Sequence, residues 1–133
     1  MKISLKSIQK NIWAECRRIK NVKQATTCFI CGSDLTKAKS RQLGHLIPKT
    51  FLPTQMKYDL RLLEPCCYYC NINCGGNGFV FGEKMKQKYG HQFILEIYND
   101  FSYWKSLEKL TDKEKLTYYS ELLEKYKTIL PTK

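Results

Sequence analysis

Long apolar runs are missing from this 133-residue sequence. None approaches the roughly 20 residues of a membrane-spanning helix, and the opening residues, MKISLKSIQK, lack the apolar stretch of a secretory signal. Acidic residues are also scarce, because 12 Asp and Glu stand against 23 Lys and Arg, a formal charge of +11. We therefore expect a cytoplasmic protein with no membrane partner, in a reducing compartment that disfavours disulfides.

Positive charge is concentrated in the first part of the chain. Residues 1–60 carry 12 Lys or Arg and three acids, a net of +9, whereas residues 61–133 carry 11 and nine, a net of +2. This asymmetry predicts a polyanion partner, usually nucleic acid, although a merely solvated face or an anionic membrane surface would give the same counts. The side chains expected to contact DNA phosphates are Lys6, Lys10, Arg17, Arg18, Lys37, Lys39, Arg41 and Lys49.

Two CxxC pairs stand out among the seven cysteines, Cys28 with Cys31 and Cys67 with Cys70. This spacing lets two thiolates of one turn face the same ion, and two such turns complete a tetrahedral zinc site. A redox CxxC is the competing interpretation, but a redox pair has no need of a second one. Gly32 directly after the first pair suits a turn that requires positive φ. The sequence therefore predicts a structural zinc ion.

The remaining cysteines leave part of this assignment open. Cys66 and Cys74 each lie four residues from Cys70 and could share a helical face with it. The CxxC spacing favours Cys67 instead as the partner of Cys70. Cys16 falls on the apolar side of a predicted helix, where it is expected to be a small core residue.

Helices are predicted near both ends of the chain. Apolar residues recur every three or four positions over about 3–20, which indicates an amphipathic helix. The motif Thr111-Asp-Lys-Glu114 is a capping box that starts a last helix. Apolar stripes over 116–130 and from Phe93 to Trp104 predict either core faces or a homodimer interface.

The middle of the chain predicts short strands and turns. Residues 42–47 indicate one strand, and a second is expected around 59–64, stopped by Pro65. A helix over 79–89 follows, with Gly90 as its stop signal.

Together these elements predict a mostly helical α+β fold in a single domain, 1–133. A basic N-terminal helix would occupy 1–25, a small zinc-stapled core 26–90, and C-terminal helices for packing or dimerisation 91–133.

The order of elements in the core predicts a hydrolytic site. A strand carrying His45, a second strand and a helix starting beside a zinc cysteine is the order of a ββα-metal nuclease core. In such a core a histidine deprotonates water and one divalent metal neutralises the scissile phosphate. Asn71, directly after the second CxxC pair, is a suitable oxygen ligand for that metal. Alternatively, His45 is a packed residue or an extra zinc ligand, Asn71 caps a turn, and Asn77 serves only for positive φ.

Several motifs over 28–90 also resemble a known family. They are Cys28-x-x-Cys31-Gly, Gly44-His45-Leu-Ile-Pro48-Lys49, Lys57-Tyr58-Asp59, Cys67-x-x-Cys70-Asn71, Gly76-Asn77 and Tyr89-Gly90. In these motifs the chain resembles the phage lambda NinG (Rap) recombination family. Its CxxC/His/CxxCN layout is similar to phage T4 endonuclease VII, which has an HNH (His-Me finger) site.

The resemblance implies a structure-selective endonuclease that cuts branched recombination intermediates such as Holliday junctions and D-loops. By position, the four CxxC cysteines would hold zinc, His45 would be the general base and Asn71 a ligand of catalytic Mg²⁺ or Mn²⁺. Asp59 and Asn77 match further positions of the family and would complete the metal site. A homodimer is expected because a four-way junction has two strands to cut. A phage-encoded protein would act in the host cytoplasm or nucleoid.

Two departures concern the catalytic metal. Enzymes like endonuclease VII carry an acid directly before the histidine, where this chain has Gly44. NinG-like sequences usually carry an acid two residues before that glycine, at the position of Gln42. Asp59 is therefore the expected carboxylate, with Glu64 and Glu83 as substitutes. Two alternatives stay open: an HNH nuclease that nicks or restricts duplex DNA, and a non-catalytic zinc module that binds branched or single-stranded nucleic acid.

Overall fold

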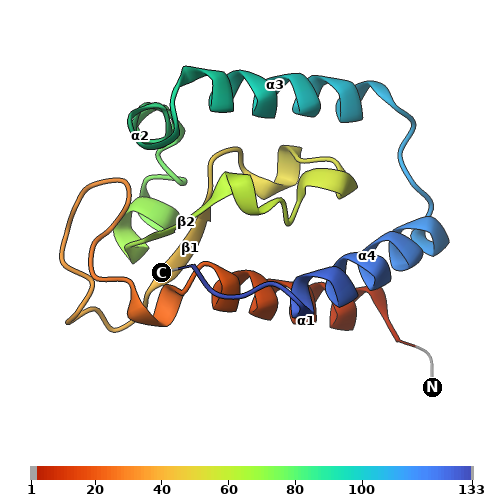
Figure 1. Ribbon diagram of the computed structural model, residues 1–133, viewed down its shortest axis with the longest axis horizontal. Helices are drawn as coiled ribbons and strands as arrows, with labels where there is room; N and C mark the ends of the chain where they lie inside the picture. The colour runs from red at the N-terminus through yellow and green to blue at the C-terminus, as the bar shows by residue number, and fades with distance from the viewer. Residues whose placement is uncertain (1–2, 133) are drawn as a thin grey trace.

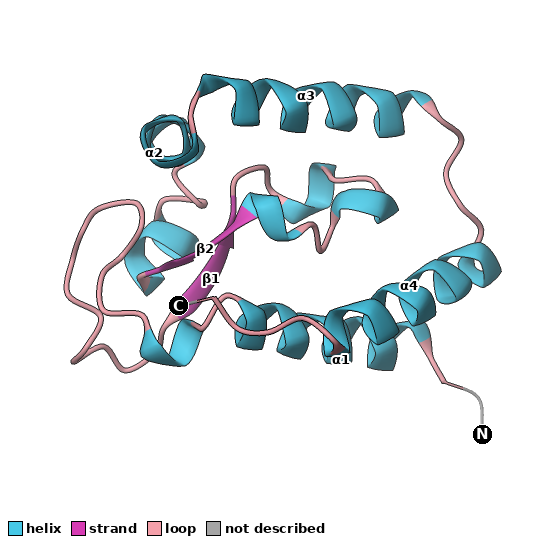
Figure 2. Cartoon of the chain, viewed as in Figure 1, coloured by secondary structure: helices cyan, strands magenta, loops and turns pink. Residues whose placement is uncertain are grey.

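The computed structural model describes residues 3–132 as three tiers (Figure 1). A two-stranded antiparallel sheet lies in the middle tier, with helices on either side of it (Figure 2). The elements, in chain order, are α1 (Leu5–Ile19), β1 (Gln42–His45), β2 (Leu63–Cys66), α2 (Gly78–Tyr89), α3 (His91–Ser106) and α4 (Asp112–Lys127). The predicted small α+β fold is thus confirmed at the level of its class. Among the described residues, no helix combines the length and apolarity that crossing a membrane requires.

One face of the sheet packs against the first and last helices. Ile12 and Cys16 of α1 are fully buried, and they share an apolar cluster with Leu43 of β1, Leu63 of β2 and Tyr119 of α4. We call this set the α1/α4 face. The two helices run in the same direction, with the start of α4 beside the start of α1 (Figure 1). The predicted stripe of α4 is therefore a core face of this chain.

The end of the α1/α4 face is fixed by polar contacts. The Arg18 guanidinium donates to the carbonyl of Tyr126 at 2.9 Å, and the Thr132 N–H donates to the carbonyl of Ile19 at 2.8 Å. Leu130, the last residue of the predicted stripe, lies beyond α4 and is 83% exposed. The stripe thus ends one turn earlier than its spacing suggested.

The other face of the sheet packs against α2 and α3. Its apolar cluster combines Cys66 of β2, Phe81 of α2 and Ile97 of α3 with the two buried CxxC cysteines, Cys28 and Cys70. We call this set the α2/α3 face. Of the predicted Phe93–Trp104 stripe, Phe93, Phe101 and Trp104 pack against this cluster, whereas Tyr98 is exposed.

The second strand begins later than its sequence predicts. Residues 59–62 form a 3₁₀ turn, because the Asp59 carboxylate accepts the N–H of Arg61 and the Asp59 carbonyl accepts that of Leu62. Strand β2 starts at Leu63, and Pro65 lies inside it rather than after it. A proline is tolerated at this place because the outer edge of β2 faces a loop, whose Phe29 N–H donates to the Pro65 carbonyl.

The side chains of β1 divide between two faces of the sheet, because successive residues of a strand point to opposite sides. Gln42 pairs with Cys66 and Gly44 with Glu64, while Leu43 pairs with Pro65 and His45 with Leu63. Gln42 and Gly44 therefore lie on one side of β1, and Leu43 and His45 on the other.

Candidate functional site

Four cysteines form a compact cluster at one end of the sheet. The Sγ atoms of Cys28, Cys31, Cys67 and Cys70 all lie within 4.8 Å of one another. With Zn–S bonds of about 2.3 Å, the sulfurs of a tetrahedral site are separated by about 3.8 Å. The Sγ atoms of Cys31 and Cys67 are 3.8 Å apart. The cluster could therefore hold a zinc ion with little movement, as the paired CxxC spacing predicts.

Local backbone geometry orients these thiols. The N–H groups of Ile30 and Cys31 point at Cys28 Sγ at 3.4 Å, and the N–H of Cys70 points at Cys67 Sγ at the same distance. Gly32 has a φ of +77°, the left-handed turn expected after the first pair. Such N–H···S contacts stabilise thiolates, the form that binds metal.

The thiols differ in their surroundings. Cys31 Sγ is hydrogen-bonded to the Ser33 hydroxyl, which lowers the pKa of Cys31 to about 6. Burial raises the pKa of Cys66 to about 12 and that of Cys16 to about 12. Cys66 and Cys16 are fully buried outside the four-cysteine cluster, and Cys74 is exposed outside it. The structure thus agrees with the choice of Cys67 and with a core role for Cys16.

His45 lies at the end of β1 on the α1/α4 face. Its ring stacks on Trp13 of α1, with ring centroids 5.3 Å apart and an angle of 4° between the planes. Its Nε2 lies 2.9 Å from the carbonyl oxygen of Lys57. A carbonyl oxygen only accepts hydrogen bonds, so Nε2 carries the proton and Nδ1 of the neutral ring keeps a free lone pair. Burial is the main cause that lowers the pKa of His45 below its usual value.

Asn71 lies in a five-residue π-helical turn, Tyr69–Asn73, that follows the second CxxC pair. Its Nδ2 donates to Oε1 of Gln42 at 3.2 Å. Its Oδ1 faces Gly44, where an added Cβ would lie 3.4 Å from it. The structure thus joins Asn71 to the two β1 positions at which the endonuclease VII and NinG patterns carry an acid.

Gly44 is required by a close approach of β1 and β2. A Cβ at this position would lie 2.9 Å from Cys66 Sγ, closer than such atoms come. An acidic side chain therefore has no room at residue 44, which explains one departure from the endonuclease VII pattern. The amide of Gln42 lies beside Asn71 instead.

The expected carboxylates are engaged elsewhere. Asp59 accepts three hydrogen bonds from the Arg61 guanidinium, the shortest at 2.6 Å, and the same guanidinium contacts Asp100 of α3 at 2.9 Å. Glu83 is on the exposed side of α2, 3.5 Å from Lys86. Neither carboxylate contacts Asn71 or His45 among the contacts of residues 3–132.

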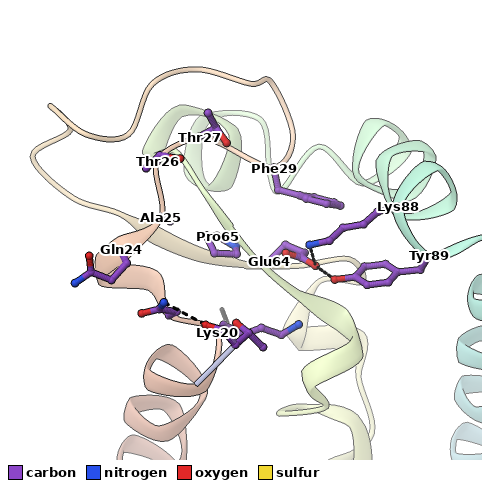
Figure 3. A pocket seen from close by; sticks show the side chains of 12 residues that line it. Lys20, Gln24, Ala25, Thr26, Thr27, Phe29, Glu64, Pro65, Lys88 and Tyr89 are labelled. Atoms are coloured by element: carbon purple, nitrogen blue, oxygen red, sulfur yellow. Dashed lines mark hydrogen bonds and ion pairs between the residues drawn. The ribbon is translucent and has the colours of Figure 1, made fainter. Parts of the chain in front are cut away.

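Glu64 is buried and points to α2 (Figure 3). It accepts a hydrogen bond from the Tyr89 hydroxyl and an ion-pair contact at 3.4 Å from Lys88. These three residues line a cavity of about 390 Å³ together with Lys20. Glu64 is thus committed to a separate polar cluster.

Asn77 has a φ of +50° and precedes α2 without a side-chain capping bond. This backbone conformation fits the simpler prediction for Asn77, that it occupies a left-handed position. The loop nevertheless passes close to the site, since a Cβ at Gly76 would lie 3.7 Å from the His45 carbonyl.

Comparisons with protein-family models, curated proteins and solved structures found no match. The resemblance to the recombination family therefore stays a prediction.

The basic residues expected to contact DNA divide into two groups. The arginines are used within the fold: Arg17 donates to the Arg41 carbonyl at 3.1 Å, Arg41 to the Ala25 carbonyl at 2.8 Å, and Arg18 to Glu15 at 2.6 Å. The lysines are exposed and available to a ligand, namely Lys6, Lys10, Lys37, Lys39 and Lys49.

Sequence reasoning missed three contributors. Trp13 lies 32 residues before the histidine that it stacks on, beside the apolar stripe of α1. The second contributor, the Lys57 carbonyl, is a backbone group, so no residue type in the sequence indicates its contact with His45. The third contributor is a group of lysines near Lys57, namely Lys115, Lys49 and Lys109. Burial is the main cause that lowers the pKa of the Lys57 ammonium, and the positive charges of these three lysines lower it further. The charge count by halves of the chain hid this group because its members come from both halves.

Proposed function

We propose that the chain is a zinc-stabilised, metal-dependent DNA endonuclease of the ββα-metal (HNH) type that acts on branched DNA. The observation that carries the proposal is that two contacts fix the tautomer and the orientation of the His45 imidazole. A backbone carbonyl fixes its tautomer, a tryptophan ring fixes its plane, and its Nδ1 is left as a base.

His45 suits the abstraction of a proton from water. Burial favours the neutral ring by lowering the pKa of His45, so the base form predominates at neutral pH. When Nδ1 takes the proton, the Lys57 carbonyl accepts the Nε2–H throughout, which stabilises the resulting imidazolium. The order of β1, β2, the π-helical turn and α2 around the four cysteines is compatible with a ββα-metal core.

The Gln42–Asn71 pair is the place for a divalent ion. Amide oxygens are hard ligands of the kind that Mg²⁺ and Mn²⁺ accept, and Mg²⁺ commonly takes its other ligands from water and substrate phosphate. An ion bound there would neutralise charge on the scissile phosphate and its leaving oxygen. Gln42 and His45 are three residues apart on β1 and extend toward opposite faces of the strand, so β1 itself separates the proposed base from the proposed ion.

Branched DNA is the proposed substrate because the positive charge and the family resemblance agree on it. Five exposed lysines, from α1 and from the loops around β1, supply contacts to phosphates. Resolution of a four-way junction requires two sites, hence a homodimer. The stripe of α4 is already used against α1, so α3, whose Leu95, Tyr98 and Tyr103 are exposed, is the proposed interface.

A specific observation favours a second function, a zinc module that binds branched DNA without cutting it. Both residues of the proposed metal site are neutral amides, and Asp59 is held by Arg61. A site without a carboxylate binds Mg²⁺ weakly.

Cleavage of a labelled four-way junction and of a matched duplex, with Mg²⁺, Mn²⁺ or EDTA, distinguishes these functions. We expect paired cuts in the junction alone; cuts in both substrates would indicate a duplex nuclease, and binding without cuts the non-catalytic module. His45→Ala should abolish cleavage but keep zinc and junction binding. His91→Ala, at the exposed start of α3, is the matched control and should cut normally. Full activity of His45→Ala would eliminate the assigned base.

Gln42→Glu tests the metal site from the opposite direction. A carboxylate beside Asn71 adds a charge of the sign that attracts the ion, so half-maximal cleavage should need about tenfold less Mg²⁺. Gln42→Met, which removes the oxygen at similar size, should need more. Equal Mg²⁺ dependence of both variants would place the ion elsewhere.

A further inference from the structure

A cavity of about 250 Å³ lies between the loop that follows β1 and the connection from α3 to α4. Its walls include Trp104 and four lysines, Lys57, Lys105, Lys109 and Lys115. The sequence predicts packing or dimerisation for the C-terminal helices, residues 91–133, which carry little of the net positive charge. The fold instead brings three of their lysines together with one from the basic half.

The positive charge of this cavity is poorly compensated. Glu108 is the one acid in its wall, against four lysines. None of the ion pairs within residues 3–132 involves any of these lysines. Ammonium groups gathered in this way repel one another and favour a bound anion.

The cavity and the proposed active site share one residue. The carbonyl of Lys57 accepts a hydrogen bond from Nε2 of His45, and Lys57 also lines the cavity. Lys49 lies over the ring of Tyr58, the residue after Lys57, 5.0 Å from the centroid. Lysines therefore gather around the segment that contacts the proposed base.

We propose that this cavity binds a backbone phosphate of the DNA strand next to the phosphate that is cut. The identity of the anion rests on the proposed function. The cavity adds a second phosphate contact that orients the strand at His45. A nucleic-acid backbone fits better than an acidic protein because Lys57, in the cavity wall, also contacts the proposed base, His45.

The test is the salt dependence of junction binding in EDTA, where no cleavage occurs. Lys105, Lys109 and Lys115 are replaced together by Gln, and the dissociation constant is measured by fluorescence anisotropy at several salt concentrations. Removal of one phosphate contact lowers the log–log salt slope by about 0.9. Between 50 and 200 mM salt, the fold-change in affinity should therefore be about threefold smaller for every phosphate that the variant no longer binds.

The matched control removes the same charge elsewhere. Lys84, Lys86 and Lys125 are exposed, lie outside the cavity and are also replaced by Gln. We expect a normal slope for this control, or a smaller change than for the cavity variant. Equal slopes for the two variants would overturn the proposal, as would wild-type protein that binds an acidic protein but not DNA at 50 mM salt.

Folding and function are read out separately. The cavity variant should melt at a temperature at or above that of the wild type, because it relieves repulsion between lysines. A triple change to Arg keeps the charge and should retain the slope. If the Gln variant fails to fold, Lys109→Gln alone should lower the slope by less than the roughly 0.9 expected for a whole phosphate contact, and an unchanged slope would overturn the proposal. An unchanged slope with His45-dependent cleavage overturns only the cavity. A lowered slope in a wild-type protein that never cuts overturns only the nuclease.

Discussion

The two faces of the small sheet are stabilised in different ways. The α1/α4 face consists of two long helices whose aliphatic and aromatic side chains meet directly, with Ile12 fully buried between them. The α2/α3 face packs α2 and α3 against short turns, loop residues and a four-cysteine cluster. The first face resembles an ordinary hydrophobic core, while the second also contains four thiols that could hold a metal ion.

The comparison also divides the proposed chemistry. His45 and Leu43 extend from β1 toward the α1/α4 face, whereas Gln42 and Gly44 face Asn71 and Phe81 on the α2/α3 side. The proposed base therefore lies on the α1/α4 side, and the proposed ion lies on the side of the four-cysteine cluster, which could hold zinc. Each face can be perturbed separately.

Loss of zinc should have the largest effect. Cys67→Ser removes one thiolate, and structural zinc binding is worth on the order of 10 kcal/mol in small zinc proteins. We expect loss of zinc by metal analysis and a collapsed melting transition of the α2/α3 face. Helix signal from α1 and α4 should outlast it in circular dichroism. Cys74→Ser, outside the cluster and exposed, should leave zinc and melting unchanged.

Truncation in the other core should be the next largest effect. Ile12→Ala leaves a hole in a fully buried position and should lower the free energy of unfolding by about 2–5 kcal/mol, measured with urea. Zinc content should stay at one ion per chain in the folded protein. Zinc release at urea concentrations where α1 is still folded would contradict the independence of the two faces.

A smaller effect is expected where the two faces meet. Gly44→Ala places a methyl group 2.9 Å from Cys66 Sγ and should cost about 1–3 kcal/mol. Cys66→Ala removes that sulfur, so the double variant should be more stable than the sum of the two single changes. Additive effects in this double-mutant cycle would show that the close approach costs nothing.

The smallest effect should come from the titration of His45. Its folded-state pKa is lowered, so its contribution to stability is fully present above its unfolded pKa of about 6.5 and is lost as the pH falls toward the folded value. The melting temperature of the wild type should therefore decline relative to His45→Gln on going from pH 8 to pH 5. A constant difference between the two proteins across this range would show that the ring titrates normally.

Local signals account for what the sequence could predict. The capping box at Thr111, the stripe of α1 and the two CxxC pairs each lie within a few residues, and each appears in the structure as expected. Asp59 shows the limit of such signals. The sequence predicts a strand around 59–64, but the Asp59 carboxylate accepts the N–H of Arg61 and stabilises a 3₁₀ turn at its start.

Contacts between distant residues escaped prediction. Asn71 and Gln42 are 29 residues apart, and neither residue type alone indicates a partner. The cavity lysines are separated by several elements and meet only because the α3–α4 connection returns to the loop after β1. Such pairings follow from the packing of the whole chain, which a single sequence does not encode in any one segment.

The pairing of α1 with α4 has a consequence for synthesis. Ile19 and Thr132 are hydrogen-bonded across 113 positions of the chain, so the ribosome must release α4 before α1 can be covered. At roughly 5–20 residues per second, the four cysteines and α2 emerge seconds earlier. Until then the apolar side of α1 is exposed on the nascent chain, where a chaperone can bind it. The four cysteines, which could hold zinc, are thus free to take up an ion before the α1/α4 face is complete.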